Sequence, residues 1–264
     1  MNMDALRKQY REDGVVFLPR ALDKRALDEA LAAYEWSLAN PGPGASRIKQ
    51  HGDALFYQDL YNPRCTAAYR PMLEASPLNR IIADIWQTPD VWFMYEQVFL
   101  KEGGESRRTP WHQDSSYLAV AGDDLAVAWI TFDRVAKEES LEFVRGSHRG
   151  TLYNGSSFAL DDDTAPLHAG DALPRLPDIE AARSKYDIVA YGVEPGDVVL
   201  FHPAMLHGGA PTHPGQRRRT LTLRYLGRDS FYDRRPGPTG PRLTPGHGMQ
   251  HGDRLRDPLF LKLL

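Results

Sequence analysis

Hydrophobic and polar residues are arranged differently in the first third of the chain and in the rest. Residues 23–39 place Leu27 and Leu31 at helical spacing, with Asp23 in the position of a helix N-cap and glycine and proline after the last turn. Residues 77–87 show a second helical pattern that ends before a proline. The first third of the chain is therefore predicted to contain helices, with one short apolar strand, GVVFLP, before the first of them.

From about residue 91 the pattern changes to short runs of aromatic and β-branched residues, which favour strands. Proline and glycine punctuate these runs, as expected for turns between strands. The predicted strands are 91–101, 125–135, 140–144, a run that begins at Val198, and 219–227. Short strands of this kind, preceded by helices, predict a mainly β antiparallel barrel or sandwich with helices packed outside.

The chain shows no internal repeat and no interdomain linker, so we expect a single domain over residues 1–264. Within it we expect N-terminal helices over about residues 1–90 and a barrel over about 91–227. A polar stretch at about 150–187 is too long for an ordinary connection and is predicted to be an insert or lid. The Pro/Gly-rich residues 228–264 are expected to form an irregular tail.

Composition narrows the class of protein without identifying its chemistry. The apolar content of 42% and the charged content of 25% are typical of a globular domain, and the formal charge of −3 provides no field that attracts nucleic acid or anionic membrane. Cys65 is the only cysteine, which excludes an internal disulfide framework and fits a reducing compartment. We therefore expect a soluble cytoplasmic protein that acts on a small molecule, without a nucleic-acid or membrane partner. The sequence does not indicate the oligomeric state.

The pattern His-x-Asp occurs three times, beginning at His51, His112 and His251. Residues i and i+2 of a strand point to the same face, so such a pair can present an imidazole and a carboxylate to one metal ion. His51 lies in a predicted loop and His251 in the irregular tail, whereas His112 follows a predicted strand and has aromatic neighbours that can exclude water. We therefore favour His112 and Asp114 as two of the three ligands of a 2-His-1-carboxylate site, against the alternative of ordinary loop hydrogen bonding.

The third ligand is sought in EPGDVVLFHPAMLHGGAP, which offers His202 and His207. His207 is favoured because two glycines follow it, and small residues allow a close approach of backbone and ligand. The alternation in the strand that follows predicts one polar face, formed by Arg218, Thr220, Thr222 and Arg224. The guanidinium of Arg218 suits bidentate binding of a small carboxylate. A solvated basic turn is the alternative for its RRR sequence.

These residues carry a resemblance to a known family. The order His112-x-Asp114, then His207, then Arg218 eleven positions later resembles the phytanoyl-CoA dioxygenase family of Fe(II)/2-oxoglutarate oxygenases. The segments EDGVVFLPRAL, AWITFDRVAKEESLEFVRGSHRG and EPGDVVLFH are similar to further parts of that family, so the resemblance covers most of residues 10–226.

The resemblance implies a double-stranded β-helix, a jelly-roll or cupin-like barrel, with His112, Asp114 and His207 as ligands of Fe(II). Arg218 would bind the distal carboxylate of 2-oxoglutarate, with O2 as the oxidant. Three further residues match positions that can contact the co-substrate or line its pocket: Lys101, Gln97 and Trp129. For these the ordinary alternatives are a solvated lysine and a core tryptophan. Gly209 departs from relatives that have serine there, which removes one co-substrate hydrogen bond.

The implied reaction is hydroxylation of an unactivated C–H bond of a small organic substrate, with release of succinate and CO2. The presence of Asp114 argues against halogenation, because halogenating relatives lack this carboxylate. Two alternatives remain open: a cupin-like metal-dependent isomerase or lyase that does not use 2-oxoglutarate, and a non-catalytic ligand-binding barrel. The insert and the loop around His51 and Tyr57 are the expected specificity elements, because binding residues concentrate on loops over a rigid scaffold.

Overall fold

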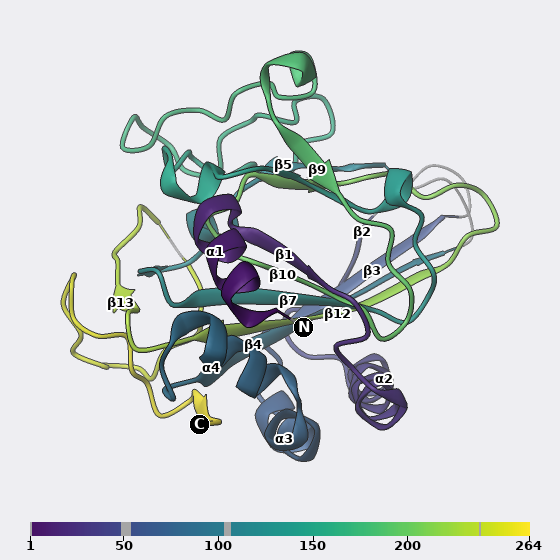
Figure 1. Ribbon diagram of the computed structural model, residues 1–264. Helices are drawn as coiled ribbons and strands as arrows, with labels where there is room; N and C mark the ends of the chain where they lie inside the picture. The colour runs from purple at the N-terminus through teal and green to yellow at the C-terminus, as the bar shows by residue number, and fades with distance from the viewer. Residues whose placement is uncertain (1, 49–53, 103–106, 238) are drawn as a thin grey trace.

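A large antiparallel sheet lies between a layer of helices and a smaller sheet (Figure 1). The computed structural model describes residues 2–48, 54–102, 107–237 and 239–264. The helices are α1 (Met3–Asp13), α2 (Lys24–Ala39), α3 (Cys65–Ala75) and α4 (Leu78–Trp86). The two predicted helices correspond to α2 and α4, and the side chain of Asp23 accepts a hydrogen bond from the Ala26 amide, which confirms the predicted N-cap. Helices α1 and α3 were not predicted.

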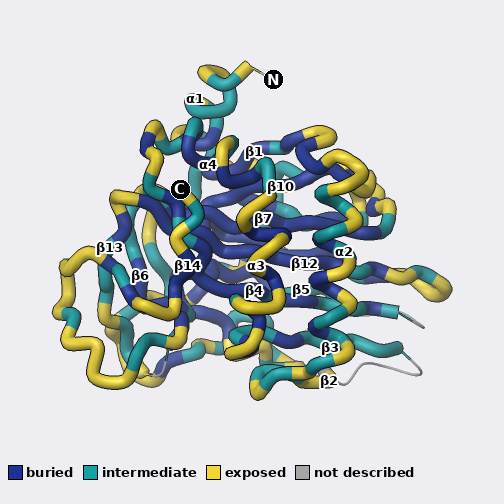
Figure 2. The backbone as a smooth tube through the Cα atoms, turned by 90° about the horizontal axis from the view of Figure 1, so that it is seen from below, coloured by how far each residue is buried: buried dark blue, intermediate teal, exposed yellow. Residues whose placement is uncertain are grey.

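The large sheet has the strand order β1-β10-β7-β12-β4-β3-β2, and β14 also pairs with β4. Its strands are β1 (Val15–Leu18), β2 (Ser46–Ile48), β3 (Leu55–Leu60), β4 (Trp92–Glu102), β7 (Leu125–Thr131), β10 (Val198–Phe201), β12 (Arg218–Leu226) and β14 (Leu261–Lys262). The residues before 90 thus supply three strands as well as helices. Strand β7 is buried along its whole length, in keeping with its central position (Figure 2).

The smaller sheet has the order β5-β11-β8-β9. Its strands are β5 (Thr109–His112), β11 (His207–Gly209), β8 (Leu141–Val144) and β9 (Ile188–Ala190), and β6 (Val120–Ala121) pairs separately with β13 (Phe231–Tyr232). The predicted fold class, mainly β with flanking helices in a jelly-roll arrangement, is confirmed. The two sheets remain separate and do not close into one hydrogen-bonded barrel.

Strand β12 connects the core to the site because its side chains alternate between two environments. Leu221, Leu223 and Tyr225 belong to the apolar cluster shared with the helices. The opposite face, predicted to be polar, lines a cavity between the sheets. Burial of the leucine face fixes the register of the strand, since a slip of one residue would put the arginines into the core.

Residues 150–187 form a mostly irregular excursion beside the smaller sheet (Figure 1). Two of its apolar residues, Phe158 and Leu160, line the cavity although they are 42% and 81% exposed. Within the described parts of the chain, none of the helices combines the length and the apolar character needed to cross a bilayer.

Candidate metal centre

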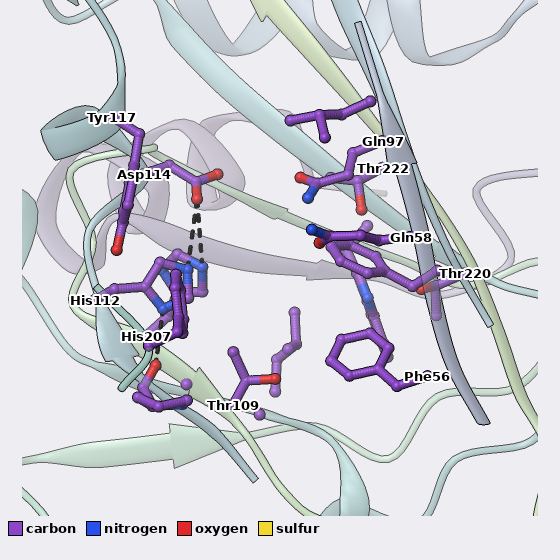
Figure 3. Close-up of a pocket in the computed structure, with 18 of the residues that line it drawn as sticks. Phe56, Gln58, Gln97, Thr109, His112, Asp114, Tyr117, His207, Thr220 and Thr222 are labelled. Atoms are coloured by element: carbon purple, nitrogen blue, oxygen red, sulfur yellow. Dashed lines mark hydrogen bonds and ion pairs between the residues drawn. The ribbon is translucent and has the colours of Figure 1, made fainter. Parts of the chain in front are cut away.

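His112, Asp114 and His207 meet at one end of the cavity (Figure 3). His112 is the last residue of β5 and His207 the first of β11, and the ladder between these strands places the two histidines directly opposite each other. Asp114 begins the short 3-10 helix Asp114–Tyr117 immediately after β5. All three side chains are buried, and one potential ligand atom from each lies within 4.8 Å of the others.

Backbone carbonyls orient both imidazoles. The Nδ1 atom of His112 lies 2.8 Å from the carbonyl oxygen of Pro110, and that of His207 lies 3.0 Å from the carbonyl oxygen of Met205. A carbonyl only accepts, so each Nδ1 carries the proton and each Nε2 keeps its lone pair. Both Nε2 atoms face the Oδ1 atom of Asp114, at 3.6 Å for His112 and 3.9 Å for His207. This tautomer leaves both Nε2 atoms able to bind a metal ion.

The protonation states also suit a cation. Burial alone would raise the pKa of Asp114, but the guanidinium of Arg224, whose Nη2 lies 2.9 Å from Oδ2, and the neighbouring histidines hold that pKa well below its usual range. Burial, together with the proximity of His112, lowers the pKa of His207 to about 4. At neutral pH the cluster therefore contains an ionised carboxylate and a neutral His207, as metal binding demands.

Besides Arg224, two more buried cations line the same cavity, which has a volume of about 1080 Å³. Lys101 of β4 pairs directly with Arg218 of β12, and both are less than a tenth exposed. The Lys101 ammonium lies 4.4 Å from the centre of the Phe56 ring and has no hydrogen-bond partner among the described residues. Burial, with the charge of Arg218 beside it, lowers the pKa of Lys101 well below its usual value, and burial lowers that of Arg218 to about 10.

The guanidinium of Arg218 is held by backbone oxygens. Its Nη2 donates to the carbonyl of Ala210 at 3.1 Å and its Nη1 to the carbonyl of Glu139. The Glu139 carboxylate accepts instead from Gln216, at 2.5 Å. Lys101 and Arg218 therefore lie side by side, and among the described residues no carboxylate forms a salt bridge with either. A negatively charged ligand would satisfy both.

The remaining predicted cofactor contacts, Gln97 and Trp129, also line the cavity. The Oε1 atom of Gln97 accepts a hydrogen bond from Arg224 at 2.8 Å, so part of its hydrogen-bonding capacity is already used. Trp129 is 4% exposed and packs in the apolar cluster between the sheets, so it is a core residue that also forms part of the cavity wall.

The other histidines considered as ligands lie elsewhere. His202 is buried, with Nε2 3.0 Å from the carbonyl of Gly122 and Nδ1 accepting from the Ala204 amide, so neither nitrogen is available. The side chain of His251 is 68% exposed and contacts Asp233 in the tail. His51 lies outside the described residues. Among the described residues, His112, Asp114 and His207 form the one group of potential metal ligands that lie close enough together to hold an ion.

Several residues of the cavity were not singled out from the sequence. Phe56 and Gln58 of β3 face the triad across the cavity, beside the polar face of β12 (Figure 3). Tyr57, expected in a specificity loop, lies instead in β3 and packs on the main apolar cluster, because alternate strand residues point to opposite faces. Phe158 of the insert approaches His112, with 5.4 Å between ring centres, and nothing in its local sequence predicts this contact.

Comparison with known proteins identifies the family of the chain. The family model described as phytanoyl-CoA dioxygenase (PhyH) matches residues 10–220. The chain belongs to this family. The human (Homo sapiens) peroxisomal phytanoyl-CoA dioxygenase is 24% identical over 149 residues, which cover 54% of this chain and 42% of that protein. A probable alpha-ketoglutarate-dependent hypophosphite dioxygenase of Stutzerimonas stutzeri is 27% identical over 129 residues, which cover 46% of this chain and 40% of that protein. The chain thus spans about two fifths of the length of these relatives.

Solved structures share the fold. The epimerase SnoN, in complex with Fe3+, alpha ketoglutarate and nogalamycin RO, superposes with a TM-score of 0.71 at 19% identity, over 99% of this chain and 98% of that chain. EctD from S. alaskensis, in its apoform, superposes with a TM-score of 0.66 at 16% identity, over 90% of this chain and 81% of that chain. At identities this low, the superpositions show only that this member of the phytanoyl-CoA dioxygenase family has the same fold as these proteins.

Proposed function

We propose that this protein is a 2-oxoglutarate-dependent non-haem iron dioxygenase that hydroxylates an unactivated C–H bond of a small organic substrate. The products of the co-substrate would be succinate and CO2. The observation that supports the proposal is the combination, in one cavity, of a buried His-Asp-His cluster and the adjacent buried cations Lys101 and Arg218, neither of which forms a salt bridge with a carboxylate of the described residues. The family to which the chain belongs supports the same chemistry.

The donor set fits Fe(II). Two neutral imidazole nitrogens and one carboxylate oxygen form the 2-His-1-carboxylate arrangement that leaves coordination positions open. His112, Asp114 and His207 would hold the ion, and the iron would supply O2 activation coupled to decarboxylation of the co-substrate. The backbone carbonyls behind the two imidazoles keep the Nε2 atoms aimed at one point, so the chain prepares the site before the metal binds.

The cationic pair fits the co-substrate. A dicarboxylate bound to the metal through one end can present its distal carboxylate to Arg218 and Lys101, which compensates two buried positive charges. Gly209 lacks the serine hydroxyl found in some relatives. The hydroxyl of Thr109 lies 3.3 Å from the point that a Cβ atom at position 209 would occupy. We therefore expect Thr109 to donate the missing hydrogen bond.

The cavity has space for a substrate beside the co-substrate. Its volume of about 1080 Å³ is at the upper end of pockets that hold drug-sized ligands, roughly 300–1,000 Å³. Aromatic side chains cover the space next to the triad, with Tyr117 stacked on Phe158 at 6.0 Å between ring centres. We expect the substrate to lie under the insert, where Phe158 and Leu160 exclude water from the reacting C–H bond.

One assay separates this proposal from its alternatives. The protein is incubated with Fe(II) and 2-oxoglutarate under air, and succinate is measured over time. Slow release without added substrate, stimulated by candidate substrates, is the expected result. The His112→Ala variant should show no release, whereas the matched variant of an exposed histidine, His251→Ala, should behave as the parent protein. Metal binding without succinate would favour a cupin-like isomerase or lyase, and absence of metal binding would favour a ligand-binding barrel.

A cytoplasmic location is part of the proposal, supported by the single, buried Cys65, which needs no oxidising compartment. Fractionation of the source cells tests it, and recovery with the membrane fraction would contradict it.

A further inference from the structure

Arg224 is a buried arginine in contact with the carboxylate of the candidate metal centre. It lies on the polar face of β12, and only 5% of its surface is exposed. Its Nη2 atom lies 2.9 Å from Oδ2 of Asp114 and 2.8 Å from Oε1 of Gln97. Its guanidinium lies over the ring of Tyr95, 4.7 Å from the ring centre. Three neighbours therefore fix the position of this cation.

The hydrogen bond from Arg224 gives the two oxygens of Asp114 different surroundings. Oδ1 is the oxygen that faces the Nε2 atoms of His112 and His207, at 3.6 Å and 3.9 Å. Oδ2 is occupied by Arg224. A carboxylate that is free to rotate can bind a metal through either oxygen or through both, but here a fixed donor holds one oxygen away from the space between the imidazoles.

We propose that Arg224 is a positioning residue that makes Asp114 bind the metal through a single oxygen. The inference rests on the proposed metal site. Two imidazoles and one carboxylate oxygen occupy three positions of an octahedral ion, which leaves two for the co-substrate and one for O2. Binding through both oxygens of Asp114 would fill a fourth position and leave none for O2 once the co-substrate is bound. Arg224 thus keeps the last position open.

The surroundings of Arg224 suit this role. The Nε and Nη1 atoms of Arg224 are buried and have no hydrogen-bond partner among the described residues, so the interactions of this side chain are concentrated on the Nη2 atom and on the Tyr95 ring. Gln97 helps to hold Arg224 in place, because its side-chain oxygen accepts a hydrogen bond from the guanidinium.

Nitric oxide, a stand-in for O2, tests the proposal without turnover. The protein is loaded with Fe(II) and 2-oxoglutarate under anaerobic conditions, and nitric oxide binding is titrated by electron paramagnetic resonance. The Arg224→Met variant has no donor, and in Arg224→Gln the uncharged amide ends at the position of the arginine Nε atom, short of the Nη2 atom that contacts Asp114. Both variants should bind nitric oxide about 10- to 100-fold more weakly, the range by which metal affinity or activity falls when a partner of a metal ligand is removed. Arg224→Lys retains a donor and should recover most of the affinity.

Arg219→Met is the matched control, because Arg219 is another arginine of β12, points to the opposite face from Arg224 and pairs with Asp133 at 2.9 Å. It should bind nitric oxide like the parent protein. Co(II) titration of each variant reports metal binding separately. If the parent protein binds neither Co(II) nor Fe(II), the proposed function itself fails. If the parent protein binds metal, and a folded Arg224→Met or Arg224→Gln variant binds nitric oxide as tightly as the parent, the role of Arg224 is refuted.

Discussion

Replacement of Lys101 by methionine should stabilise the free protein and weaken its binding of 2-oxoglutarate. The Lys101 side chain is buried beside Arg218 and has no hydrogen-bond partner among the described residues, so when Lys101 is protonated its charge is uncompensated there until an anion binds. Methionine has a similar length and fills the same space under the Phe56 ring without the charge. The two effects have opposite signs, which makes the variant informative.

The magnitudes follow from these contacts. Removal of an unpartnered buried donor should raise the free energy of unfolding by about 1–3 kcal/mol. Loss of the cation–π contact with Phe56 should lower it by about 1 kcal/mol. A net gain of about 1 kcal/mol should raise Tm by about 2–4 °C for a protein of this size. Loss of a hydrogen bond to a charged carboxylate, about 1.5–3 kcal/mol, should weaken 2-oxoglutarate binding by about 10- to 150-fold.

The pH dependence has a defined sign. Burial, and then the charge of Arg218, place the pKa of Lys101 in the folded protein well below the ordinary value of 10.5. Below the folded-state pKa the lysine is protonated in both the folded and the unfolded protein, and the full free-energy cost of burying its charge lowers stability. Between that pKa and 10.5 the unfolded chain binds more protons, so the stability of the parent protein rises with pH. The part of the advantage of Lys101→Met that comes from removing the charge should therefore shrink as the pH rises and vanish near 10.5.

Thermal melts followed by circular dichroism, with and without 2-oxoglutarate, and calorimetric titration of the Co(II)-loaded protein provide both quantities. Lys137→Met, which removes an exposed lysine, is the control and should change neither. A lower Tm of Lys101→Met than of the parent protein in the absence of ligand, or unchanged affinity for 2-oxoglutarate, would show that Lys101 does not bind the co-substrate.

Three further outcomes are expected. His207→Ala should abolish tight Co(II) binding and succinate release, whereas an unchanged Co(II) titration would remove this residue from the ligand set. Arg218→Lys keeps the charge but loses the planar fork held by backbone carbonyls, so KM for 2-oxoglutarate should rise about tenfold with a smaller change in kcat; steady-state kinetics would contradict this if only kcat fell. Asp23→Ala removes the N-cap of α2 and should lower stability by about 1 kcal/mol in denaturant melts, with normal metal binding.

The sequence predicts those parts of the fold whose signals are local. The alternation in β12 placed Arg218, Thr220, Thr222 and Arg224 on one face, and the structure puts all four on the cavity wall. Helix α3 was missed because it has no side-chain cap and contains Pro71. A helix of this kind is stabilised by packing against its neighbours and leaves little trace in its own sequence.

The contacts that give the site its detail are not local. Arg224 and Asp114 lie 110 positions apart, and their proximity depends on how β12 and β5 face each other across the cavity. The approach of Phe158 to His112 likewise depends on the path of an irregular insert, where Phe158 has a positive φ of 56° that few aromatic residues adopt. Periodicity reports which face a side chain occupies, but it does not identify the residue across the gap.

The order of strands in the large sheet has a consequence for folding. In that sheet Val15 pairs with Phe201 and Thr131 with Thr220, and in the smaller sheet His112 pairs with His207, so pairings in both sheets join segments that are remote along the chain. Proteins dominated by such long-range contacts fold slowly, on time scales of roughly milliseconds to seconds. A metal that needs both His112 and His207 can bind only after the smaller sheet has formed. Added metal should therefore slow unfolding and leave the refolding rate unchanged.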